Sequence, residues 1–162
     1  MTVKEFVDGY TQLGSEQLRN KYVKELLKRD YVPYLEKMQY AKNAVNAVYL
    51  SDINGKKTFQ YNSNISFLLY IRSIITMYYT IEFEKDENNI NEISQYDLLF
   101  KNSLVSVLMS NIPEEELKTY EIVFGNERND VIDNNTDLSI KISEMDNIVS
   151  EMLNRISSEI EW

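Results

Sequence analysis

The chain has 162 residues, and none of them is cysteine or histidine. Without cysteine there is no disulfide, no thiolate metal site and no cysteine nucleophile. Without histidine, the commonest general base and the commonest metal ligand are both missing. An enzyme built from this chain would depend on carboxylates, lysine, tyrosine or serine. We therefore predict that the protein is not an enzyme and that it carries neither a cofactor nor a metal ion.

Glycine and proline are also scarce, with four and two residues respectively. An antiparallel β-sandwich would need turn residues every 8–12 positions, so this composition favours long helices. The apolar content of 43% is enough for an ordinary core. We predict an all-α fold with residues 1–162 forming a single helical domain. The first ten residues contain no apolar run typical of a signal peptide, so secretion is not expected.

The most apolar stretch is residues 65–81, in which twelve of seventeen residues are apolar or aromatic. They do not form a single stripe, and a helix that is apolar nearly all round must be covered by protein or by lipid. Arg72 lies near the middle and several Ser and Thr residues interrupt the run, which favours protein over membrane. We predict a buried central helix at about 64–81, surrounded by the rest of a six-to-eight-helix bundle. Arg72 would then need a carboxylate or carbonyl partner.

Several short signals predict where helices begin. Thr2 and Glu5 have the spacing of a capping box, and Ser15 can cap a second helix. Pro33 and Pro113 suit the first turn of two later helices. A turn at residues 54–55 followed by a short strand at 58–61 predicts a small hairpin, and a helix break is expected at 102–103, with residue 103 as the new cap.

The last helix is predicted at about 137–160 and is amphipathic. Its apolar residues are spaced 4, 3, 4, 3, 4, which makes a seam of three heptads. The seam consists of Leu138, Ile142, Met145, Val149, Met152 and Ile156. Such a seam can pack inside the domain or against a second copy of the chain.

Charge is unevenly distributed along the sequence. Residues 1–81 hold 11 Lys and Arg against 7 Asp and Glu, whereas residues 82–162 hold 6 against 19. Opposite charge on the two halves could attract copies of the chain head to tail, although ordinary solubility explains the same imbalance. A basic helix at residues 16–29 could follow a nucleic-acid backbone, but the net charge of −9 argues against this.

Two acidic segments could hold a cation. Residues 114–116 are all glutamate, and this cluster also suits the positive end of a helix dipole. Residues 133–144 place oxygen-bearing side chains at the positions of a calcium-binding loop. Leu138 replaces the glycine that such a loop needs, and Lys141 puts a cation into the site. We therefore expect solvated faces rather than metal sites.

Two short motifs resemble those of a known group of proteins. They are Tyr31-Val32-Pro33-Tyr34-x-x-Lys37 and Ile112-Pro113-Glu114-x-Glu116, in a composition rich in Asn, Ile, Lys and Tyr. In these features the chain resembles small all-helical accessory proteins of tailed phages that infect low-GC bacteria. The resemblance implies a protein that works by contacts with other proteins, in the host cytoplasm or in the virion. It defines no functional residue.

The leading hypothesis is a non-enzymatic protein–protein interaction protein, a phage virion-assembly or structural accessory component. The alternative is an acidic inhibitor that imitates nucleic acid and blocks a host nucleic-acid-binding or defence protein. We expect a protein partner or self-association, and no direct contact with nucleic acid, membrane or a small-molecule ligand. The candidate contact residues are Arg19, Lys24, Lys28, Arg29, Glu114, Glu115, Glu116, Met145 and Met152.

Overall fold

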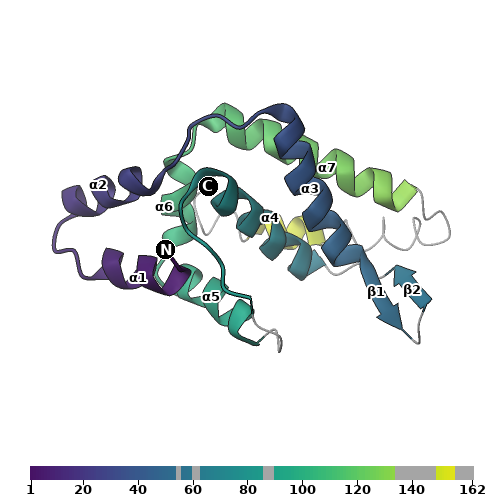
Figure 1. Ribbon diagram of the computed structural model, residues 1–162, viewed down its shortest axis with the longest axis horizontal. Coiled ribbons are helices and arrows are strands. Elements are labelled where there is room, and N and C mark those ends of the chain that lie inside the picture. The colour runs from purple at the N-terminus through teal and green to yellow at the C-terminus, as the bar shows by residue number, and fades with distance from the viewer. Residues whose placement is uncertain (54–55, 60–62, 86–89, 134–148, 156–162) are drawn as a thin grey trace. The chain divides into compact units, whose positions relative to one another are not determined.

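The computed structural model describes residues 1–53, 56–59, 63–85, 90–133 and 149–155 (Figure 1). The fold class is all-α, as predicted, with one small antiparallel hairpin. The elements are α1 (Val3–Thr11), α2 (Glu16–Leu26), α3 (Tyr34–Tyr49), β1 (Leu50–Ile53), β2 (Lys56–Phe59), α4 (Ser63–Tyr78), α5 (Ile90–Lys101), α6 (Leu104–Ser110) and α7 (Glu114–Asp133). The hairpin pairs Leu50 with Phe59 and Ile53 with Lys56.

The chain divides into two compact units. Unit 1 contains Met1–Val32 and Ile74–Leu117, and unit 2 contains the described parts of Pro33–Ser73 and Lys118–Glu161. The prediction of a single domain stays a prediction.

The helix starts in unit 1 follow the local signals. Thr2 Oγ1 accepts a hydrogen bond from Glu5 N at 3.2 Å, and Thr2 N donates to the Glu5 carboxylate at 2.9 Å. This reciprocal pair is the predicted capping box. Ser15 Oγ accepts from Leu18 N and caps α2. In the same unit α1 lies beside α5 (Figure 1).

A short extended segment, Tyr79 to Glu84, joins three parts of unit 1. Thr80 N donates to Leu26 O at 3.0 Å, and Glu82 N donates to Met1 O at 2.8 Å. Buried and exposed side chains alternate along the segment, as they do in a strand with one face in the core. Because these residues pair with other segments, α4 ends at Tyr78, and the predicted helical extension to residue 81 is wrong.

The prediction of a sheathed central helix is confirmed for only part of α4. Its later apolar residues, from Ile71 to Tyr78, are fully buried, whereas Ile65 near its start is 46% exposed. Among the described residues, no helix is both long enough and apolar enough to cross a membrane.

Unit 2 is organised around aromatic rings. Tyr70 stacks on Tyr120 with ring centroids 5.7 Å apart, and Phe124 meets the edge of Tyr70 at 5.1 Å. Ser73 Oγ and the Tyr120 hydroxyl share a buried hydrogen bond of 2.6 Å. Offset-stacked and edge-to-face arrangements of this kind stabilise beyond the area that they bury.

Two local predictions have mixed outcomes. The break at 102–103 is confirmed, but Ser103 lies in the left-handed region with φ 55° and its side chain caps nothing. Most of the predicted C-terminal seam, including Met145, lies outside the described residues. Within 149–155 the chain is helical, and Met152 is 48% exposed.

Candidate interaction surfaces

The basic face predicted on α2 is partly used inside the protein. Arg19 Nε donates to Leu13 O at 3.0 Å, and the guanidinium lies 5.4 Å from the centre of the Tyr10 ring. Arg19 therefore ties the start of α2 to the end of α1. Arg19 is half-buried, and its role as a contact with a partner stays a prediction.

Arg29 is also a structural residue. Its Nε donates to Met77 O at 2.7 Å, and Lys28 N donates to Tyr78 O at 2.8 Å. The last carbonyls of a helix have no partner within the helix, and a cation near them is favoured by the dipole. Arg29 thus completes the C-terminal end of α4, and its role as an outside contact stays a prediction. Only the side chains of Lys24 and Lys28 remain exposed among the four predicted basic contacts.

The three glutamates at the start of α7 do not share one environment. Glu114 and Glu115 are exposed, whereas Glu116 is 8% exposed. Glu116 Oε1 accepts from Val32 N at 2.7 Å and from the Tyr78 hydroxyl at 3.0 Å. The prediction that Glu116 is a surface contact is therefore wrong, because this carboxylate satisfies two buried donors of unit 1.

The spacing along α7 contains the signal that identifies Glu116 as buried. Glu116, Tyr120, Val123 and Glu127 follow one another at intervals of 4, 3 and 4, and all four are buried. Residues at this spacing share one face of a helix. As three consecutive glutamates, residues 114–116 look equivalent. The helical spacing shows that Glu116 lies on the buried face of α7 and that the other two do not.

The hydroxyl groups of the buried tyrosines are held in the neutral form. Desolvation raises the pKa of Tyr120, and the hydrogen bond between its hydroxyl and Ser73 partly offsets this rise. Desolvation, and then the charge of Glu121, raises the pKa of Tyr70. Desolvation raises the pKa of Tyr79, which donates to Leu108 O at 2.6 Å. Tyr79 is thus an internal donor in unit 1, and Tyr120 shares a buried hydrogen bond with Ser73 in unit 2.

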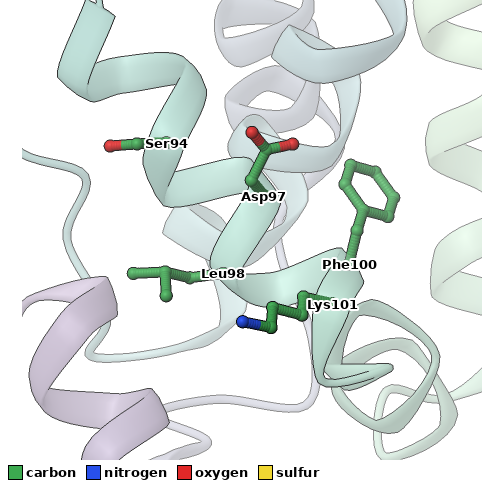
Figure 2. Close-up of a pocket in the computed structure, with 5 residues that line it drawn as sticks. All are labelled: Ser94, Asp97, Leu98, Phe100 and Lys101. Atoms are coloured by element: carbon green, nitrogen blue, oxygen red, sulfur yellow. The ribbon is translucent and has the colours of Figure 1, made fainter.

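Two open hollows lie on single helices of unit 1. The larger, of about 680 Å³, is lined by Ser94, Asp97, Leu98, Phe100 and Lys101 of α5 (Figure 2). In Figure 2, Leu98 and Phe100 extend to opposite sides of the helix, so the five side chains do not converge on one point. The smaller, of about 490 Å³, lies on α2 around Lys21 and Lys24, where Lys21 and Glu25 form an exposed ion pair of 3.9 Å.

Neither hollow brings together a set of groups aimed at one reacting atom. Across the described part of the chain, no three acidic side chains gather closely enough to hold a metal ion. The calcium-loop pattern at 133–144 lies, beyond its first residue, outside the described residues. The functional assignment therefore rests on what the exposed surface offers to a partner.

Large apolar side chains are exposed at several places. In unit 2, exposed Pro33 directly precedes α3, and the helix begins with Tyr34 at 52% and Leu35 at 79% exposure. Ile122 on α7 is 63% exposed, and in unit 1 Ile93 on α5 is 57% exposed. Scattered apolar residues are ordinary on a surface, but consecutive ones at a helix start are typical of a contact site.

Comparison of this chain with known proteins found no matching family model, no matching curated protein and no matching solved structure.

Proposed function

We propose that this chain is a non-enzymatic protein–protein interaction protein that serves in phage virion assembly. The observation that carries the proposal is the apolar start of α3, formed by Pro33, Tyr34 and Leu35 and called the α3 entry patch below. Leu35 is the most exposed large apolar residue of the described chain, at 79%. The resemblance of its motifs to phage accessory proteins supplies the biological setting.

The α3 entry patch offers a partner a favourable free energy. Burying a leucine or tyrosine that is otherwise in water stabilises a complex by about 1.5–3 kcal/mol per side chain. Aromatic residues are enriched among those that dominate binding energy in protein interfaces. Pro33 stiffens the backbone just before the two anchors, so little conformational entropy is lost when they are covered.

Incorporation into particles tests this proposal. A tagged chain is expressed during infection by the phage that encodes it, particles and their precursors are purified, and the chain is quantified by mass spectrometry. We expect the wild type in particles or precursors at a constant ratio to a structural protein. Tyr34→Ser with Leu35→Ser should lower that ratio by about tenfold or more, because both anchors are lost.

The matched control is Lys42→Ser with Asn46→Ser, since both of these residues are exposed on the same helix. This control should leave incorporation unchanged. Equal incorporation of the wild type and the patch variant would overturn the role of the patch. Absence of the wild type from every particle fraction would overturn the assembly function.

The alternative function, an acidic inhibitor, has one specific observation in its favour. Glu82 and Glu84 are both exposed and stand two residues apart on the extended segment of unit 1. Glu84 N donates to Gln95 Oε1 and Gln95 Nε2 donates to Glu84 O, both at 2.8 Å. These two hydrogen bonds fix the backbone of the segment at Glu84. Carboxylates two residues apart on a strand are about 7 Å from each other, a spacing that could occupy a basic site. Competition between this chain and DNA for a host nucleic-acid-binding protein tests the alternative function. The double variant Glu82→Gln with Glu84→Gln should abolish the competition.

A further inference from the structure

The outward face of α7 in unit 2 carries a second regular pattern. Lys118, Ile122, Gly125 and Asn129, called the α7 outer stripe below, follow one another at intervals of 4, 3 and 4. This is the spacing of one helix face, and it lies opposite the buried face formed by Tyr120, Val123 and Phe124. Three of the four residues are exposed and Gly125 is half-buried.

Ile122 is the one large apolar side chain of this stripe, and it is 63% exposed. The other positions of α7 in unit 2 that the structure describes as exposed are polar. An isolated isoleucine in such a setting projects from the helix as a knob that a partner can enclose.

Gly125 lies one turn further along the same stripe. Glycine inside a helix is less stable than alanine by about 1 kcal/mol, because it loses more backbone freedom. A Cβ added at Gly125 would meet no atom within 4 Å among the residues that the structure describes, so none of these residues requires a glycine there. The missing side chain leaves a notch through which a second helix can approach the backbone closely.

We propose that the α7 outer stripe binds the same stripe of a second copy in an antiparallel pair. In antiparallel helix pairs, residues at the two alternating positions of such a stripe face each other across the interface. Ile122 of each copy then enters the notch at Gly125 of the other, and Lys118 faces Asn129. One surface supplies both knob and notch, so a twofold axis satisfies both contacts at once. This inference rests on the proposed protein–protein function and names its partner.

The charges beside the stripe fit this arrangement. Glu121 is exposed and Arg128 half-buried, and they lie seven residues apart along the same edge of α7. In the antiparallel pair, Glu121 of each copy comes beside Arg128 of the other. Arg128 Nε is buried, and no residue of the described ranges forms a hydrogen bond with it. Two symmetric ion pairs therefore flank the two knobs, and they favour the antiparallel orientation.

Sedimentation analysis of the full chain over a range of concentrations tests the inference. We expect a concentration-dependent dimer that Ile122→Ser weakens by about tenfold or more. Gly125→Leu should also abolish the dimer by filling the notch, while raising the thermal unfolding midpoint because leucine is the better helix former. These opposite changes separate an interface role of Gly125 from a purely structural one.

Charge reversal supplies a further test. Glu121→Arg and Arg128→Glu should each weaken the dimer, and the double variant should restore it. Ile65→Ser, which removes another exposed isoleucine of unit 2, is the control and should change nothing. A chain that stays monomeric throughout, or a dimer unaffected by Gly125→Leu, would overturn the inference. Loss of particle incorporation by the α3 entry patch variant would still support the proposed function in either case.

Discussion

The two units of this protein satisfy their buried polar groups in different ways. In unit 1 a buried carboxylate, that of Glu116, accepts hydrogen bonds from Val32 N and from the Tyr78 hydroxyl. In unit 2 Tyr70, Tyr120 and Phe124 form a cluster of aromatic rings, and the Tyr120 hydroxyl shares a hydrogen bond with Ser73. A substitution should therefore destabilise the two units for different reasons. Removal of the Glu116 carboxylate leaves buried donors unsatisfied in unit 1, whereas removal of the Tyr120 ring leaves a cavity in unit 2.

The largest effect is expected in unit 2. Tyr120→Ala removes a ring that is fully buried and should lower the free energy of unfolding by about 3–5 kcal/mol. Urea denaturation followed by circular dichroism measures this change. Tyr120→Phe keeps the ring, and Ser73 Oγ still donates to Tyr70 O at 2.7 Å, so we expect a loss of about 1 kcal/mol. Equal losses for the two variants would contradict a core held mainly by ring packing.

The corresponding test in unit 1 is Glu116→Ala. It leaves Val32 N–H and the Tyr78 hydroxyl without their acceptor, and each unsatisfied donor costs about 1–3 kcal/mol. We expect a loss of about 2–5 kcal/mol in urea denaturation. Glu116→Gln retains an acceptor oxygen and should cost less. The neighbouring Glu115→Ala, at an exposed position, should stay within about 0.5 kcal/mol, and a comparable loss there would refute the assignment of Glu116 as the buried member of the run.

Alkaline pH should destabilise both units. Burial raises the pKa of Tyr70 and Tyr120 in unit 2 and of Tyr79 in unit 1. In the unfolded chain these groups ionise near pH 10, so above that pH the unfolded state binds fewer protons and stability falls. Each tyrosine contributes a loss of about 1.4 kcal/mol per pH unit above about 10, and none below it. Denaturation at a series of pH values measures how fast the free energy of unfolding falls with pH. In Tyr70→Phe this fall should be smaller by about 1.4 kcal/mol per pH unit.

The smallest effect concerns the two neighbouring cations after α2. Arg29→Ala removes the donor to Met77 O and should cost about 1–2 kcal/mol, with faster hydrogen exchange at the end of α4. Lys28→Ala should change stability by no more than about 0.5 kcal/mol, since its side chain is exposed. If both variants behave alike, Arg29 is not the residue that completes the C-terminal end of α4.

Local sequence was sufficient for several features. The capping box at Thr2 and Glu5, the cap at Ser15 and the helix starts after Pro33 and Pro113 were all predicted and are all present. Each depends on groups within about four residues of one another, so no knowledge of the rest of the chain was needed. The all-α class follows in the same way from scarce glycine and proline and from helical spacing of apolar residues.

The candidate contact residues were less predictable, because their roles depend on distant partners. Arg29 and Glu116 looked like members of charged surface runs, and both turn out to serve unit 1 internally. Leu35, which carries the proposed function, lies in the first turn of α3, and its exposure of 79% became apparent only in the structure.

By itself, then, the sequence determined where helices begin, which class of fold they form and which chemical groups are absent. Only the tertiary structure decided which charged side chains turn inward, where α4 gives way to an extended segment and which apolar residues stay exposed. The physical reason is the separation along the sequence over which each effect acts. Caps and helical periodicity depend on residues only a few positions apart. Burial depends on contacts between segments that are tens of residues apart, which no local pattern specifies.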